Sequence, residues 1–142
     1  MFYSDRARLE AMKGEFDFTA FFRALSDRTR LRLLNLMSGR EVCVCYFVEI
    51  LGTSQPKISR HLAYLRDAGI VSARREGKWM HYRMAEPDNP TAKKMLAELL
   101  ESLKADPRMK GERNKLDCIC CAPIPPRRLK SAPVPQLTQI EV

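Results

Sequence analysis

SQPKISRHLAYLRDAGIVSARREGKWMHYRM, residues 54–84, is the stretch of sequence that decides the fold. In its first half, Ile58, Leu62 and Leu65 recur at the spacing of one helix face. In its second half the helical spacing stops, and Met80, Tyr82 and Met84, after a turn at Gly77, alternate with His81 and Arg83, which predicts two strands joined by a tight turn. The stretch is therefore expected to fold as a helix followed by a β-hairpin.

Helical spacing also marks the chain on both sides of this stretch. Before it we expect helical structure over 5–37, divided at the N-cap residue types Ser26 and Asp27, and then a short helix over about 42–51. After it, the leucines of 90–104 predict a last amphipathic helix. Helices, a short turn, a helix and a hairpin, in this order, make a winged helix-turn-helix. The fold class is therefore expected to be mainly α with a β-hairpin wing (α+β).

The composition changes after residue 105. Six of the nine prolines lie there, and no apolar periodicity continues. This predicts a mostly irregular, Pro-rich tail over 106–142 that carries a Cys cluster. The remaining residues, 1–105, suit one DNA-binding and dimerisation domain, which agrees with a total length of 142 residues.

The charge is concentrated in the stretch that decides the fold. The chain has 25 Lys and Arg against 17 Asp and Glu, a formal net charge of +8. Residues 54–84 alone carry seven Lys and Arg against two Asp and Glu, so a polyanionic partner is expected. The longest apolar run, Val42 to Val48, is too short to cross a membrane, and the N-terminus lacks the features of a secretory signal. A cytoplasmic protein that does not contact membranes is expected.

The polar side of the expected helix and the hairpin tip hold residue types that contact DNA. Gln and Arg make bidentate hydrogen bonds to adenine and guanine edges, and Lys and Ser serve bases or phosphates. A solvated basic surface would show the same charges, but the order of the elements favours DNA binding. The expected contacts are Ser54, Gln55, Lys57, Ser59, Arg60 and His61 in the helix, and Arg74, Arg75 and Lys78 in the hairpin.

Three aromatic side chains have other expected roles. His61 lies beside the apolar stripe of its helix, so a packed or phosphate-facing position is expected rather than a metal ligand. His81 is expected on the polar face of the second strand, and Trp79 is expected to pack at the base of the hairpin.

Four segments together resemble a known family. FFRALSDRTRLRLLNL from Phe21, SQPKISRHLAYLRDAGIV from Ser54 and REGKWMHYRM from Arg75 resemble the ArsR/SmtB family of metal-responsive bacterial repressors, over about residues 18–104. EVCVCYFVEIL from Glu41 resembles its arsenic- and antimony-sensing branch. The resemblance implies a homodimer joined through its first and last helices. It also implies a recognition helix over 54–68 and release from operator DNA when an effector binds.

Two of the five cysteines, Cys43 and Cys45, lie in the segment that resembles the arsenic branch. Thiolates are soft ligands, and trivalent arsenic or antimony typically takes three of them. Residues i and i+2 of a regular helix point about 200° apart, so one ion bridges this pair only if the segment begins non-helical or unwinds. The alternative is that both are small buried hydrophobes.

The third thiolate has no obvious source near this pair. The branch that the motif resembles often has a cysteine three residues after the second one, where this chain has Val48. The remaining cysteines are Cys118, Cys120 and Cys121, which are expected to complete the site. The alternatives are a flexible tail whose thiols bind no ion, or a redox-active cluster. Zinc fits poorly, because the zinc-binding branches use His and carboxylates on the last helix and 90–104 has no histidine.

The favoured hypothesis is a homodimeric repressor that binds an inverted-repeat operator and is released by trivalent arsenic or antimony. The ion is an effector, and no permanent cofactor is expected. A sensor of another soft metal, such as cadmium or lead, or of redox state, would use the same cysteines. A thiol enzyme or metallochaperone is the alternative of a different class. A catalytic cysteine needs a base or a positive neighbour, and neither cluster has an adjacent His, Lys or Arg. The chain is therefore not expected to be an enzyme.

Overall fold

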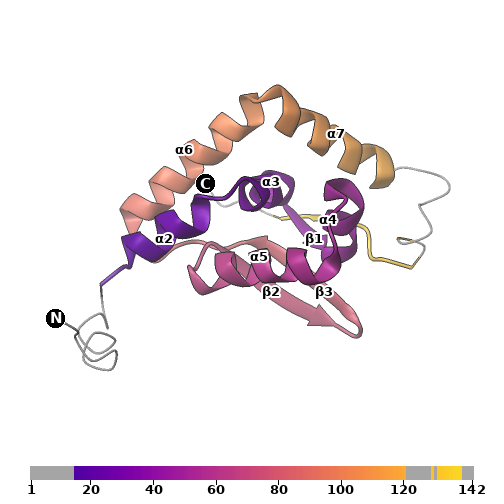
Figure 1. Cartoon of the computed structure of the whole chain (residues 1–142), viewed down its shortest axis with the longest axis horizontal. Coiled ribbons are helices and arrows are strands. Elements are labelled where there is room, and N and C mark those ends of the chain that lie inside the picture. The colour runs from indigo at the N-terminus through magenta and orange to yellow at the C-terminus, as the bar shows by residue number, and fades with distance from the viewer. Residues whose placement is uncertain (1–14, 121–128, 130, 139–142) are drawn as a thin grey trace.

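The structure is a computed structural model that describes residues 15–120, 129 and 131–138. Its helices and strands follow one another in an order that matches a winged helix (Figure 1). They are α2 (Phe18–Leu25), α3 (Arg28–Met37), β1 (Arg40–Cys43), α4 (Val44–Leu51), α5 (Gln55–Asp67), β2 (Val71–Glu76), β3 (Trp79–Met84), α6 (Pro90–Ala105), α7 (Pro107–Cys120) and β4 (Gln136–Leu137). The predicted winged helix-turn-helix is confirmed.

The helices begin at the capping residues that the sequence contains. Asp17 and Asp27 each accept a hydrogen bond of 3.0 Å from the backbone N–H three residues later, at the starts of α2 and α3. Asn89 does the same for α6. Gly52 ends α4 with φ 64°, a conformation that costs a residue with a side chain more. The helical structure predicted over 5–37 is therefore present from Phe18 as two helices, residues 15–17 are not helical, and the part before residue 15 lies outside the described residues.

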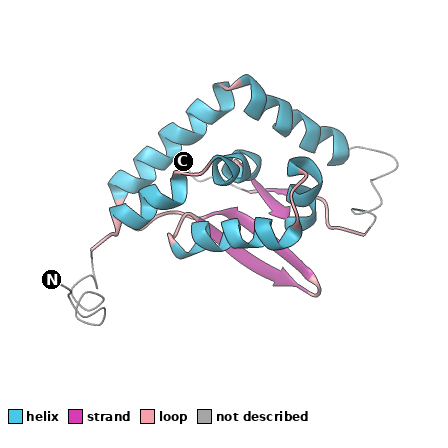
Figure 2. Cartoon of the chain, in the orientation of Figure 1, coloured by secondary structure: helices cyan, strands magenta, loops and turns pink. Residues whose placement is uncertain are grey.

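The core fills the space between the helices and the sheet. Most of its largest fully buried side chains come from α2, α3, α4 and α5, among them Phe21, Leu33, Phe47, Leu62 and Leu65. The apolar face of α5 that the sequence predicts is thus buried, which leaves its polar face toward solvent. Figure 2 shows the hairpin of β2 and β3 extending beside α5, and Figure 1 shows α6 and α7 forming an arch on the other side of α3 and α4.

One expected helix begins later than predicted. Residues 40–43 form strand β1 instead of the first turn of a helix over 42–51, which starts at Val44. β1 pairs antiparallel with β3, Val42 opposite Tyr82, and with β4 on its other edge, so the sheet order is β2-β3-β1-β4. The backbone hydrogen bonds of this segment are made with strands remote in sequence, which local apolar spacing does not reveal.

The expectation of an irregular chain after residue 105 is wrong for residues 107–120, which form α7. Asp106 ends α6 and accepts hydrogen bonds of 2.9 and 3.1 Å from the backbone N–H groups of Arg108 and Met109, while Pro107 occupies the first turn. Pro107, one of the prolines that favoured an irregular tail, therefore starts a helix. The remaining five prolines of this region lie after α7.

α7 packs onto the domain through one apolar side chain and several polar ones. Leu116 is 1% exposed. Arg32 Nε donates to Glu112 at 2.6 Å, Arg113 donates to Asn35, and Arg40 pairs with Asp117. The described part of the Cys-bearing tail is therefore attached to α3 and the start of β1. No helix among the described residues is long and apolar enough to span a membrane.

Replacing Leu116 with Ala is expected to lower the free energy of unfolding by about 2–5 kcal/mol, because it opens a cavity where α7 meets the core. Urea denaturation at one fixed protein concentration measures the loss. The neighbouring exposed Lys115 offers a matched control, and Lys115→Ala should stay within about 0.5 kcal/mol of the parent protein. Equal stability of the two variants would mean that α7 does not pack as described.

Candidate functional site

The polar face of α5 presents most of the residues expected to contact DNA. Ser54, the N-cap of α5, is exposed, as are Gln55, Lys57 and Arg60. Ser59 is half-buried. The arrangement leaves amide, ammonium and guanidinium groups on one side of a helix whose other side is buried, as a helix that enters the major groove requires.

His61 lies against α3 instead of on the exposed face. Its side chain is 26% exposed, and its Nδ1 lies 3.3 Å from Arg30 Nη1 and 3.8 Å from Asp27 Oδ1. The Arg30 guanidinium also lies over the ring of Tyr64, 4.7 Å from its centroid. Of the two positions that the sequence left open for His61, the structure favours the packed one.

The hairpin holds its three expected basic residues in different surroundings. Arg75 and Lys78 are exposed near the turn, and Lys78 Nζ lies 4.9 Å from the ring centroid of Trp79. Arg74 is ion-paired: its guanidinium donates to Glu41 at 2.5 Å and to Glu76 at 3.1 Å. Arg75 and Lys78 are therefore the more available of the three for DNA phosphates.

Two expectations for the hairpin are wrong. Trp79 pairs with Glu76 next to the turn, so it lies at the tip of the hairpin and not at its base. His81 is buried, and β1 lies alongside β3 at this position and places Cys43 opposite His81. Alternation within β3 predicted a solvated face, but on that face the carboxylates of Glu41 and Glu76 lie 3.9 and 3.3 Å from the His81 ring.

The thiols of Cys43 and Cys45 lie together where β1 passes into α4. Cys43 is extended, with φ −71° and ψ 143°, and Cys45 is in the first turn of α4. Their sulfur atoms are 3.9 Å apart. Two metal–thiolate bonds of about 2.3 Å at a tetrahedral angle span about 3.8 Å, so the two sulfurs are close enough to bind one ion. The segment that holds Cys43 and Cys45 thus begins non-helical. This is one of the two conditions under which the sequence allows one ion to bridge the pair.

The surroundings of Cys45 hold its thiol in the protonated form. Cys43 is fully buried and Cys45 is half-buried. Burial, followed by the neighbouring Cys43, raises the pKa of the Cys45 thiol to about 11. An ion that binds here must therefore displace the thiol proton of Cys45.

The end of α7 brings further thiols toward this pair. α7 contacts α4, Cys118 is exposed and Cys120 is half-buried. Burial raises the pKa of the Tyr46 hydroxyl, and the charges of Cys120, Cys43 and Cys45 raise it further. Among the described residues no three His, Cys, Asp or Glu side chains are grouped closely enough to hold a metal ion. Cys121 lies outside the described residues.

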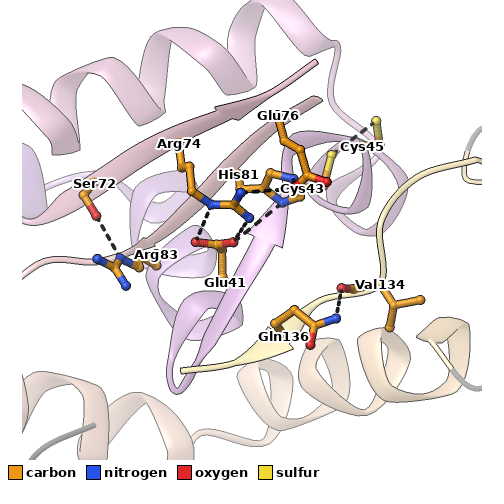
Figure 3. Close-up of polar contacts among 10 residues, drawn as sticks. All are labelled: Glu41, Cys43, Cys45, Ser72, Arg74, Glu76, His81, Arg83, Val134 and Gln136. Atoms are coloured by element: carbon orange, nitrogen blue, oxygen red, sulfur yellow. Dashed lines mark hydrogen bonds and ion pairs between the residues drawn. The ribbon is translucent and has the colours of Figure 1, made fainter. Parts of the chain in front are cut away.

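One residue of this region was not selected from the sequence. Glu41 is two residues before Cys43 on β1, and its hydrogen bond with Arg74 holds the pKa of its carboxyl below the usual value (Figure 3). Because Glu41 and Arg74 are 33 residues apart in the chain, only the pairing of the strands reveals their contact.

Comparison with known proteins places this arrangement in a family. The family model described as "Bacterial regulatory protein, arsR family" matches residues 27–73. The arsenic resistance transcriptional regulator ArsR2 of Pseudomonas putida (strain KT2440) is 38% identical over 112 residues, which cover 70% of this chain and 94% of that protein. The chain belongs to the ArsR family.

Other relatives agree with this ArsR family assignment. The arsenical resistance operon repressor of Escherichia coli K12 is 46% identical over 78 residues, 54% of this chain and 67% of that protein. Among solved structures, reduced HlyU from Vibrio cholerae N16961 has 29% identity and a TM-score of 0.53, covering 68% of this chain and 98% of that one. The transcriptional repressor BigR from Xylella fastidiosa has 29% identity and a TM-score of 0.51, covering 68% of this chain and 91% of that one.

Membership in the ArsR family decides the class of function. The chain is a winged-helix, DNA-binding transcriptional repressor and not an enzyme, so the alternative of a thiol enzyme is excluded.

Proposed function

We propose that this ArsR family protein represses transcription as a homodimer on an inverted-repeat operator and is released when trivalent arsenic or antimony binds its cysteine thiolates. The observation that carries the proposal is the 3.9 Å separation of the Cys43 and Cys45 sulfur atoms at the junction of β1 and α4. Two of the similar proteins described above are named for arsenic or arsenical resistance, which favours a trivalent metalloid as the effector.

The DNA interface of the proposal is the polar face of α5 together with the wing. α5 enters the major groove, with Gln55 and Arg60 contacting base edges and Lys57 contacting bases or phosphates. Arg75 and Lys78 of the wing contact phosphates beside the groove. A symmetric dimer presents two such helices to half-sites about 34 Å apart or a multiple of that distance.

Dimerisation through the first and last helices of the domain is part of the proposal. Phe22 of α2 is 51% exposed, and Leu99 and Leu100 of α6 are only partly buried. A large apolar side chain left in water at this position favours contact with a second copy of the chain.

Arg60→Ala is expected to lose discrimination between operator and random DNA, because a bidentate contact to a base is worth about 1–3 kcal/mol. Arg75→Ala is expected to weaken both DNAs equally and to reduce the slope of log K against log[salt] by about one, because it removes a phosphate contact. Fluorescence anisotropy with the two DNAs at several salt concentrations measures both effects. An equal loss on both DNAs for Arg60→Ala would contradict its role in reading bases.

The proposed release begins at the thiols. An ion bound by Cys43 and Cys45 ties the end of β1 to the first turn of α4. α4 leads into α5 through Gly52 and Thr53 alone, before the cap at Ser54, so a displacement of α4 reaches the recognition helix through a short connection. The ion must bind the DNA-free conformation more tightly than the DNA-bound one, since equal affinities shift nothing.

Cys120 is the proposed third ligand. It lies at the end of α7, which contacts α4, and Cys120, Cys43 and Cys45 all raise the pKa of the Tyr46 hydroxyl on α4. A closing movement of α7 toward α4 then completes a three-thiolate site. Cys118 is exposed two residues earlier and is not used in this arrangement, and Cys121 lies outside the described residues.

Cys43→Ser and Cys45→Ser are each expected to keep operator binding and lose release by arsenite, because serine retains the size but not the soft donor. Cys120→Ser should lower arsenite affinity at least tenfold, about 1.4 kcal/mol. Gel shifts on the DNA upstream of the protein's own gene, with arsenite, cadmium or peroxide added, measure release.

Cys118→Ser is the matched control and should respond as the parent protein does. Release of Cys43→Ser at the parental arsenite concentration would show that this site is wrong. Loss of response in Cys118→Ser but not in Cys120→Ser would show that the third ligand is misassigned.

A sensor of a divalent soft cation is the second candidate, because the spacing of the two sulfurs suits tetrahedral coordination as well. The two effectors differ in their proton balance. Arsenite near neutral pH is the neutral acid As(OH)₃, and each As–S bond forms as one hydroxide and one thiol proton leave together as water. Cd²⁺ brings no hydroxide, so every thiol that binds it releases a proton to solvent.

This balance predicts how affinity depends on pH. With the pKa of Cys45 near 11, its thiol stays protonated at neutral pH. Arsenite affinity should then be nearly constant between about pH 6 and 8, while cadmium affinity should rise by up to about 100-fold per pH unit when two thiols are deprotonated. Calorimetric titrations in buffers of different ionisation enthalpy count the protons. Release of about two protons on arsenite binding would contradict the proposed reaction.

A further inference from the structure

A row of paired residues crosses the sheet from the thiol site to the wing. Cys43 on β1 pairs with His81 on β3, and His81 pairs with Arg74 on β2. The three residues are therefore side by side on three adjacent strands. The wing and the cysteine pair share one sheet, and β3 is the strand that lies between them.

A polar cluster joins the two outer strands of this row. β1 and β2 are not neighbours, yet Arg74 of β2 reaches past β3 to Glu41 of β1 (Figure 3). Arg74 Nη2 donates to Glu41 Oε1 at 2.5 Å, and Arg74 Nε donates to Glu41 Oε2 at 3.4 Å. This two-point contact fixes both the separation and the orientation of the groups, which a single ion pair does not.

The surroundings of the cluster make it sensitive to movement of β1. The Glu41 side chain is 12% exposed, so loss of Arg74 would leave a largely buried carboxylate without this partner. His81 fills the space beneath, with Nδ1 3.9 Å from Glu41 Oε1 and Nε2 3.3 Å from Glu76 Oε2. Glu76 in turn accepts from Arg74. Arg74, His81 and Glu76 are thus joined to Glu41 and to one another, so a shift of Glu41 also displaces its partners on the wing.

Glu41 also lies on the same face of β1 as Cys43, because residues two apart on a strand point the same way. β1 has only four residues and is paired on both edges, so it moves as a unit. The sulfurs of Cys43 and Cys45 already lie 3.9 Å apart, so the movement comes from joining this pair to the proposed third thiol on α7, and a pull on Cys43 moves Glu41 as well.

We infer that Glu41 is a positioning residue that transmits effector binding from the Cys43–Cys45 pair to the wing through Arg74. The inference rests on the proposed function and adds a route that bypasses α5. The ion pair orients the wing in the ion-free protein, and displacement of β1 changes that orientation. Coupling of this kind is measured as the ratio of operator affinities without and with effector, and it is reciprocal between the two sites.

The test compares that ratio in the parent protein, Glu41→Gln and Arg74→Gln, with operator affinity measured by fluorescence anisotropy with and without arsenite. Each variant is expected to lower the ratio about tenfold. Arsenite affinity of the DNA-free protein, measured by calorimetry, should change less than about threefold. If the ion pair only stabilised the sheet, its loss would not lower the ratio of operator affinities while leaving arsenite affinity nearly unchanged. Glu49→Gln removes a carboxylate from α4 close to the cysteines, and as the matched control it should keep the parental ratio.

A charge swap guards against a variant that misfolds. Glu41→Arg combined with Arg74→Glu keeps an ion pair at the same positions and should recover most of the ratio. Parental ratios in both single variants, or no recovery in a folded swap variant, would overturn the inference.

A second measurement, without arsenite, separates this inference from the proposed function. The rate at which iodoacetamide alkylates Cys45 should change at least fivefold when operator binds the parent protein, and should not change in Glu41→Gln. A parent protein that arsenite does not release would contradict the proposed function alone. A change in Glu41→Gln equal to the parental one would contradict the route through Glu41.

Discussion

The pairing of strand β1 with β3 is the constraint on which the thiol site and the wing both depend. It holds Cys43 in an extended conformation, so that α4 begins only at the next residue and the sulfur atoms of Cys43 and Cys45 lie 3.9 Å apart. A helix continued back through Cys43 would point the two thiols about 200° apart. The same pairing places Cys43 beside the buried His81 and brings Glu41 within reach of Arg74. One short backbone ladder thus sets the geometry of the soft-ligand pair and of the ion pair beside it.

Among the described residues, some basic side chains are held by carboxylates and others are left to solvent. Arg32, Arg40 and Arg74 each pair with an acidic side chain, and these pairs attach α7 and the wing to the rest of the domain. Arg60, Arg75 and Lys78 are exposed on α5 and the hairpin. A count of positive charge therefore overestimates how much of it is available to a polyanion, and the distribution matters more than the total.

The helix α7 links the Cys cluster of the tail to the body of the domain by mostly polar contacts. Its one fully buried side chain is Leu116, and ion pairs and hydrogen bonds make up much of the remainder of the described contacts. Attachment of this kind costs less to rearrange than a continuous apolar seam, because the polar groups can exchange their partners for water. Such an attachment suits α7, which in the proposed function moves to bring a third thiol to α4.

The amino-acid sequence by itself determined the winged helix-turn-helix, since the helical spacing in α5, the caps of α2, α3 and α6, and the alternation after Gly77 are local signals. It also determined which residues face solvent on α5, because burial of Ile58, Leu62 and Leu65 fixes the opposite face. Tertiary structure alone decided that residues 40–43 are a strand, that His81 is buried and that Arg74 binds Glu41, because each depends on a partner far away in the chain. The helix after Pro107 falls between these cases. Its cap is visible in the sequence at Asp106, but its weak apolar periodicity hides it, and its packing is decided by Leu116 and by polar partners on α3 and β1.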